Sequence, residues 1–279
     1  MDMQSIVSGI IKNAESANPI NQGDYVGDDG FYYCGKCHTP KQAKYEFFFG
    51  ERVVPIPCEC EKQRRKAEEE ERERTAKAHR IEILRRAAFP DADMRHWTFE
   101  NDDGKNERVT NAMKRYVDNF VEFYKSGKGL LLYGSIGTGK TYAACEVANA
   151  LIDKEYPVFA THFSRVLNEL QDTFEKQKYI DGFNHYPLLI IDDLGIERNT
   201  PFAKEQVYNV IDGRYRAGLP MIITTNMTIE EIKNPRDIEN ARIYDRILER
   251  CFPIEVNGVS HRKKAIIKEY DSMKNMLGL

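Results

Sequence analysis

The chain has 279 residues, enough for one large domain or two small ones. Hydrophobic residues make up 41% and charged residues 30%, with a net charge of −3, so a core is possible but any nucleic-acid contact needs a local basic patch. No apolar run reaches the roughly 20 residues of a membrane span, and the first residues lack the basic start and apolar stretch of a secretory signal. We therefore expect a cytoplasmic protein with reduced thiols and no membrane partner.

Residues 1–60 carry four of the six cysteines, and their spacing predicts a zinc site. Cys34 and Cys37 form a C-x2-C pair, and after 20 intervening residues Cys58 and Cys60 form a C-x-C pair. Four incidental thiols or a redox pair remain alternatives, although no thioredoxin-like βαβ pattern surrounds the first pair. His38 is more simply an exposed neighbour than a ligand. Because so small a segment with few aliphatic residues cannot easily build a core, a bound metal would stabilise it.

The sequence of this zinc module leaves two kinds of partner open. Aromatic residues 32–33 are followed by lysines and could stack on bases. Residues 45–49 and 53–56 are apolar and form either a small core or a face for docking a protein. The remaining cysteines, Cys145 and Cys251, fall within helical patterns and are expected in the core.

Residues 61–90 predict a charged linker helix that ends at Pro90. The run contains no glycine, and acidic residues precede basic ones by four positions, as in Glu61 and Arg65. Such pairs support an exposed helix by roughly a few tenths of a kcal/mol each. Since the charges are mixed in sign, a nucleic-acid-binding arm is the less favoured interpretation.

Residues 91–279 alternate between helical and strand patterns. Helical periodicity marks residues 108–126, 140–154, 164–176 and 203–217, and apolar runs mark strands at 129–133, 157–161, 188–191, 220–224 and 252–256. Strands that alternate with helices of this length predict an α/β fold, with a parallel sheet flanked by helices.

The segment from Gly134 to Thr141 matches the phosphate-loop pattern G-x-x-x-x-G-K-[ST]. It lies between a predicted strand and a predicted helix, which disfavours a chance glycine turn. Its backbone amides and the helix N-terminus suit phosphate oxygens, Lys140 suits the β- and γ-phosphates, and the Thr141 hydroxyl suits Mg²⁺. The predicted ATP-binding residues are Gly134, Ser135, Ile136, Gly137, Thr138, Gly139, Lys140 and Thr141.

Polar residues follow two later strands and complete a site at the carboxyl edge of the sheet. Asp192 and Asp193 end an apolar strand, so we expect Asp192 to hold Mg²⁺ and Asp193 to orient the attacking water. Asn226 ends the next strand and could contact the γ-phosphate or that water. Arg242, Arg246 and Arg250 recur every four residues on one helix face; together they suggest a finger that reaches a neighbouring subunit.

These motifs, in this order over residues 90–270, resemble the AAA+ helicase loaders of the DnaC/DnaI type and their relatives, the IstB-type transposition helpers. The resemblance implies an AAA+ ATPase domain over residues 91–279 without a full helical lid. It also implies Asp192 and Asp193 as the Walker B pair, Asn226 as sensor 1, and Arg246, with Arg250 one turn later, as the arginine finger. Arg262 is implied as a sensor-2-like residue. The second Walker B acid is Asp where many AAA+ proteins have Glu, so turnover is expected to be slow.

The function implied by the resemblance is an ATPase that delivers a hexameric replicative helicase onto single-stranded DNA. The zinc module is then expected to contact the helicase, and the arginine finger implies self-association in the ATP state. Weak, ATP-dependent DNA binding is expected within residues 161–186, which contain basic residues and the aromatics Phe163, Phe174 and Tyr179. The alternatives are an IstB-type helper that forms filaments on duplex DNA, and a phosphate-loop kinase, for which no acceptor site or lid is apparent.

Overall fold

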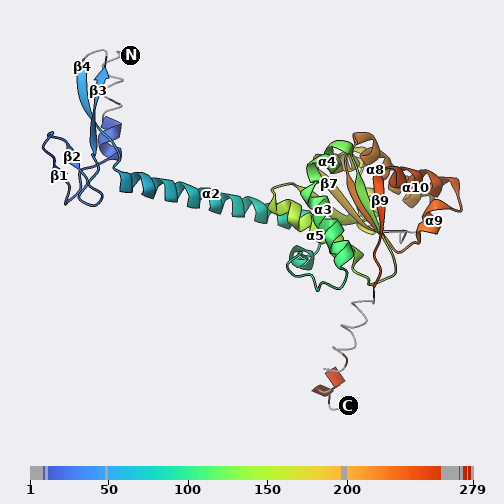
Figure 1. The fold of residues 1–279 in the computed structure, drawn as a ribbon. Coiled ribbons are helices and arrows are strands. Elements are labelled where there is room, and N and C mark those ends of the chain that lie inside the picture. Colours follow the sequence, from blue (N-terminus) through green and yellow to red (C-terminus); the bar gives the residue numbers. More distant parts are fainter. Residues whose placement is uncertain are drawn as a thin grey trace. The chain divides into compact units, whose positions relative to one another are not determined.

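The computed structural model describes residue 9, residues 12–47, 50–195 and 200–258, and the single positions 270, 273, 274, 276 and 277. The chain divides into two compact units, residues 1–78 and 79–279 (Figure 1). The division falls within a long helix, α2 (Glu59–Ala88), which corresponds to the predicted charged linker. Within the described ranges, no helix combines the length and the apolar character needed to cross a membrane.

The first unit consists of two small antiparallel pairs of strands. β1 (Tyr25–Val26) pairs with β2 (Tyr32–Tyr33), and β3 (Gln42–Phe47) pairs with β4 (Gly50–Pro55). Tyr45 and Val53 on the second pair are 50% and 44% exposed, so the small core expected there is not formed by these side chains. By exposure of the whole residue, the buried positions among the described residues of this unit are Cys34, Lys41 and Cys58, and the side chain of Asp24 is buried against Lys41.

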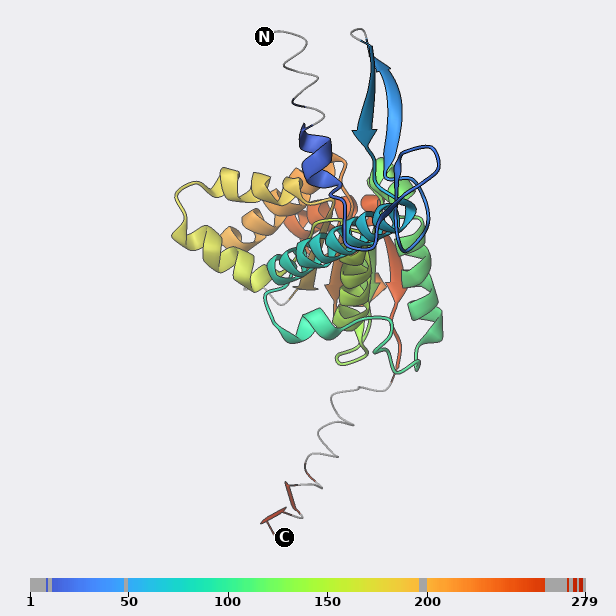
Figure 2. The ribbon, with the colours of Figure 1, turned by 90° about the vertical axis from the view of Figure 1, so that its left-hand side faces the viewer.

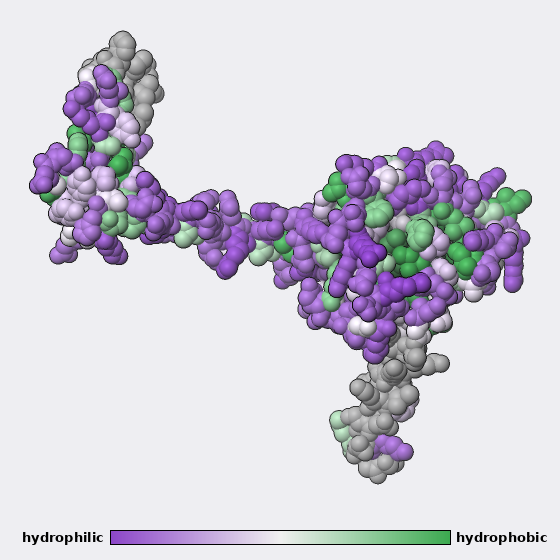
Figure 3. Space-filling model, viewed as in Figure 1, coloured by the Kyte–Doolittle hydropathy of each residue, from purple (hydrophilic) through white to green (hydrophobic). Residues whose placement is uncertain are grey.

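Helix α2 changes character along its length. Its early turns carry exposed ion pairs such as that between Arg64 Nη1 and Glu68 Oε1, at 2.7 Å, and Figure 3 shows hydrophilic side chains over its visible surface. Within the second unit, Ile81 and Leu84 pack against the core and Ala88 is fully buried. Arg85 donates to Asn149 Oδ1 at 3.1 Å, which further ties the end of α2 to this unit. The helix ends two residues before Pro90, as expected.

The second unit is built on a five-stranded parallel sheet in the order β6-β7-β8-β5-β9, which confirms the predicted α/β fold (Figure 1). The strands are β5 (Gly129–Tyr133), β6 (Val158–His162), β7 (Leu188–Leu194), β8 (Met221–Thr225) and β9 (Cys251–Glu255). Because all five run in one direction, the loops after β5, β7 and β8 meet at one edge.

Side chains that alternate along the strands support a layer of helices on each face of the sheet (Figure 2). Leu130 and Leu132 pack in the cluster with α3 (Glu107–Asp118), α4 (Phe120–Ser126) and α5 (Lys140–Asp153). Leu131, between them, packs in the opposite cluster. That second layer comprises α6 (Phe163–Asp172), α7 (Lys176–Gly182), α8 (Pro201–Ala217), α9 (Ile229–Lys233) and α10 (Ile238–Arg250). Two short 3-10 turns, Asp93–His96 and Phe183–His185, connect elements.

Three local predictions need correction. The helix expected over residues 108–126 is divided at Asn119, whose side chain donates to Arg115 O at 2.8 Å and caps α3. The helix expected over residues 164–176 ends at Asp172, and α7 begins after an extended Thr173. Cys251 is buried as expected, but it opens β9 rather than lying in a helix, because it pairs with Gly129 of β5.

Candidate functional site

The loop between β5 and α5 has the backbone that a phosphate cradle requires. Gly134 and Gly139 have φ values of +145° and +97°, a region that favours glycine. A Cβ at Gly134 would also lie 2.5 Å from the carbonyl oxygen of Val256, so no other residue fits there. The loop leads directly into α5, whose N-terminal amides attract anions.

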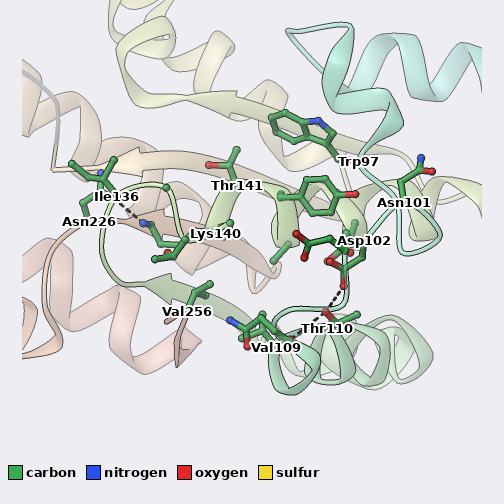
Figure 4. Close-up of a pocket in the computed structure, with 18 of the residues that line it drawn as sticks. Trp97, Asn101, Asp102, Val109, Thr110, Ile136, Lys140, Thr141, Asn226 and Val256 are labelled. Carbon is green, nitrogen blue, oxygen red and sulfur yellow. Dashed lines mark hydrogen bonds between the residues drawn. The ribbon is translucent and has the colours of Figure 1, made fainter. Parts of the chain in front are cut away.

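Lys140 brings the phosphate loop and the end of β8 together (Figure 4). Its side chain is 5% exposed, and its Nζ donates to the carbonyl oxygens of Gly134 and Ser135 at 2.9 and 2.8 Å. It also donates to Asn226 Oδ1 at 2.8 Å. The two residues that the sequence placed at the γ-phosphate are therefore hydrogen-bonded to each other.

Asp192 lies at the centre of a second polar group, beside the loop. Its carboxylate accepts from the Thr141 hydroxyl at 2.9 Å and from the Thr224 hydroxyl at 2.5 Å, and His162 Nδ1 lies 3.4 Å away. Burial raises the pKa of Asp192, but the hydrogen bonds from His162, Thr224 and Thr141 together hold it below its ordinary value. An ionised carboxylate beside a hydroxyl is a donor set that suits Mg²⁺, so these residues fit the ion.

Asp193 has an unusual backbone, with φ at 61°, and it coincides with a shift in register between β7 and β8. Its amide donates to the Thr224 hydroxyl at 3.0 Å, which fixes the turn. A positive φ at a non-glycine residue is strained and is often found at functional sites. Asp193, like Asn226, lines the cavity in front of the phosphate loop.

The cavity has a volume of about 580 Å³ and two ends (Figure 4). Lys140 and Asn226 lie at one end, and Trp97, Asn101 and Asp102 lie at the other. The sequence motifs predict the first end, and none of them predicts the second. The lining residues that were not predicted include Trp97, Asn101, Asp102, Asp103, Asn106, Val109, Thr110, Tyr142 and Glu146. The sequence features that could have indicated these lining residues are the single tryptophan, the polar residues that follow it, and a glutamate within an apolar helix.

Arg246 and Arg250 are not among the residues that line this cavity. Within the described chain, Arg246 Nε lies 2.7 Å from Asp212 Oδ1, and its guanidinium centre lies 4.6 Å from the ring centre of Tyr208. The Arg250 guanidinium centre lies 4.7 Å from the ring centre of Tyr215. Both arginines therefore pack on α8 of their own subunit. The predicted Arg262 lies outside the described residues.

The four cysteines of the first unit converge as predicted. One ligand atom from each of Cys34, Cys37, Cys58 and Cys60 lies within 4.8 Å of the others, and all four are free thiols. His38 is outside this group and lies 3.2 Å from the Tyr25 hydroxyl. The four thiols are therefore grouped rather than scattered, and their geometry is compatible with a zinc-binding domain.

Electrostatics within the cysteine cluster also favour a cation. The side chain of Thr39 and backbone amides lower the pKa of Cys37 to about 5, and amides of Cys37 and Lys36 lower the pKa of Cys34. Neighbouring thiols, Cys58 first, raise the pKa of Cys60 to about 12. Successive negative charges in so small a space repel each other, and a divalent cation would relieve that repulsion. The donor set therefore fits Zn²⁺.

Comparison with known proteins adds three findings. The model of the family described as IstB-like ATP binding protein matches residues 65–268. The Bacillus subtilis protein named replicative helicase loader DnaI is 30% identical over 167 residues, 54% of each chain, so the match spans about half of that relative. The Escherichia coli K12 protein named replicative helicase loader DnaC is 24% identical over 179 residues, 62% of this chain and 72% of that one.

A solved structure gives the same fold for the second unit. It belongs to a protein described as a candidate primosome component from Streptococcus pyogenes serotype M3. The two structures superpose with a TM-score of 0.53 at 22% identity, covering 62% of this chain and 93% of that one.

Proposed function

This chain belongs to the IstB-like ATP binding protein family, and from that premise we propose that it is an ATPase that loads a replicative DNA helicase onto single-stranded DNA. The observation that carries the ATPase part is the convergence of Lys140, Thr141 and Asn226 on one cavity of about 580 Å³, with Asp192 hydrogen-bonded to the Thr141 hydroxyl. The loader part is supported by the similarity to proteins named DnaI and DnaC.

In the proposed mechanism, Lys140 exchanges its loop carbonyl partners for phosphate oxygens when ATP binds. Thr141 and Asp192 would hold Mg²⁺, which neutralises phosphate charge. Asp193 orients and polarises the attacking water from its strained turn. Asn226, released from Lys140, contacts the γ-phosphate or that water. Hydrolysis would then release the loader from the helicase.

The proposed helicase contact is made by the first unit, with Zn²⁺ bound by its four cysteines. Exposed apolar side chains of the β3–β4 pair, Tyr45 on one face and Val53 on the other, support protein docking to this hairpin. The hexameric helicase is the proposed partner. A second copy of this chain is proposed in the ATP state, where Arg246 or Arg250 would reach the neighbouring γ-phosphate.

Weak, ATP-dependent binding of single-stranded DNA is proposed for residues 161–186. Phe174, between α6 and α7, is fully exposed, and Arg165 and Lys178 are exposed as well. The other two aromatics do not support a stacking role, since Phe163 is 1% exposed and Tyr179 packs on Phe183. The IstB-type helper is the second candidate, and the name of the matching family favours it.

Native mass spectrometry of the full chain with the helicase and, separately, with a transposase from its own genome tests the proposal. With ATP present, we expect a complex with the helicase and none with the transposase. Lys140→Ala should lose ATP binding, because the charge that balances the phosphates is removed. A stable complex with the transposase alone would contradict the loader function, and unchanged ATP affinity of Lys140→Ala would contradict the phosphate-loop assignment.

A further inference from the structure

Glu146 is a buried carboxyl in the cavity that the proposed ATPase mechanism does not use. It lines the cavity from α5, six residues after Lys140, and is 2% exposed. Its Oε1 has no hydrogen-bond partner among the described residues. A buried polar atom without a partner is costly in a folded protein, and such atoms often await a ligand. The position of Glu146 inside the cavity indicates which ligand is concerned.

Helix geometry places Glu146 at the end of the cavity away from the phosphates. Six residues of α-helix correspond to a rise of roughly 9 Å from Lys140. Tyr142, one turn before Glu146, stacks on Trp97 with ring centres 5.7 Å apart, and both rings line the cavity. Figure 4 shows Trp97 on the opposite side of the cavity from Lys140. Flat aromatic faces at this distance from a phosphate loop suit a nucleobase.

The surroundings of Glu146 keep its carboxyl group protonated by raising its pKa. Burial is the main reason that the pKa of Glu146 rises to about 8, and the carboxylates of Asp102 and Glu100 raise it further. Lys114 of α3 opposes them. Tyr142, on the same helix, is itself held neutral by burial and these acids. At pH 7 Glu146 therefore carries one O–H donor beside one carbonyl acceptor.

We infer that Glu146 pairs with the base of the bound nucleotide and selects adenine over guanine. This inference rests on the proposed function of the same cavity. In this pairing the N6–N7 edge of the base faces Glu146. Adenine offers a donor beside an acceptor at that edge, which a neutral carboxyl matches, whereas guanine offers two acceptors there. An ionised carboxylate would lose its donor and face the ring nitrogen of adenine, so ATP affinity falls as Glu146 ionises.

Calorimetric titration of the full chain with ATP, GTP and inorganic tripolyphosphate, each with Mg²⁺ at pH 7 and pH 9, tests the inference. The wild type should bind ATP roughly tenfold or more tightly than GTP at pH 7, and its ATP affinity should fall at pH 9. Glu146→Gln, which keeps a donor and an acceptor without titrating, should retain the ratio at pH 7 and the ATP affinity at both pH values. Glu146→Leu should bring the ratio close to one at pH 7. Tripolyphosphate affinity should be equal in all three proteins.

Each contrary outcome has a distinct meaning. An equal loss of ATP and GTP affinity in Glu146→Leu would show a contact with ribose and overturn the base selection. A wild-type ATP affinity that falls no more between pH 7 and pH 9 than that of Glu146→Gln would overturn it as well. If neither nucleotide nor tripolyphosphate binds the wild type, the proposed ATPase function falls together with the inference. Thermal melts of the two variants establish that both are folded.

Discussion

At the scale of single residues, Asp193 combines a strained backbone with a position in the cavity. Asp193→Asn should keep ATP binding, because Asp192 and Thr141 remain to hold Mg²⁺, but it should stop hydrolysis, because the charge that polarises water is lost. Phosphate release in single-turnover experiments measures the loss, and calorimetry measures the retained affinity. Hydrolysis at the wild-type rate would move the catalytic role to another acid, for which Glu197→Gln, outside the described residues, is the matched variant.

Glu146 should also affect stability in a pH-dependent way. Its folded pKa of about 8 lies above its ordinary value of 4.5, so the unfolded chain releases this proton first as the pH rises. The contribution of Glu146 to stability is therefore fully present below about pH 4.5 and is lost as the pH rises to 8. In the absence of nucleotide, the melting temperature of Glu146→Gln should exceed that of the wild type by an amount that grows between these values. An offset independent of pH would contradict this.

At the scale of elements, the apolar runs of the strands were sufficient to predict the sheet, because parallel strands are buried on both faces. Leu188 to Ile191 are an example, since all four are at most 2% exposed. Asp192, Asp193 and Asn226 could be predicted for the same reason, because each follows one of these apolar runs in the sequence. The far end of the cavity could not be predicted, because Trp97 and Glu146 come to line one cavity only through the packing of α5 against the segment before α3. The division between α6 and α7 could not be predicted either, because no glycine or proline marks it in the sequence.

The contacts of Arg246, on α10, with residues of α8 must be separated from its predicted role as an arginine finger. In its own subunit Arg246 pairs with Asp212 and stacks on Tyr208, so Arg246→Ala should lower stability by about 1 kcal/mol. If Arg246 also acts in trans, the variant should bind ATP but not hydrolyse it. An equimolar mixture with Asp193→Asn should regain activity, because one kind of interface then combines an intact Asp193 with an intact Arg246.

Asp212→Asn is the matched control for that experiment. It weakens the ion pair between Asp212 of α8 and Arg246 of α10 but leaves the guanidinium of Arg246 in place. Hydrolysis should therefore persist in Asp212→Asn if Arg246 reaches a neighbour. Equal loss of activity in both single variants, with no recovery in the mixture, would assign Arg246 a role within its own subunit. Arg250→Ala, tested in the same way, distinguishes the two arginines.

At the scale of the whole molecule, the two units differ in what stabilises them. The second has two extensive apolar clusters, one on each face of its sheet. In the described part of the first, only Cys34, Lys41 and Cys58 are buried as whole residues, and two of these three are thiols of the cluster. So few buried side chains cannot offset the entropy lost on ordering the chain. We therefore expect one zinc ion per chain, as measured by elemental analysis of protein purified without chelator.

Removal of the zinc ion should abolish helicase binding and leave ATP binding unchanged. A strong chelator under reducing conditions should release residues 12–58 to rapid hydrogen exchange, because without the cation the thiols no longer hold both strand pairs together. Helicase binding should be lost in the same samples, while ATP affinity stays unchanged, since every described residue of the nucleotide cavity lies in the second unit. Cys60→Ser should reproduce the effect, and Cys145→Ala, at a buried thiol of α5, is the control that should retain both zinc and helicase. Retained helicase binding in metal-free protein would place the docking surface outside the zinc module.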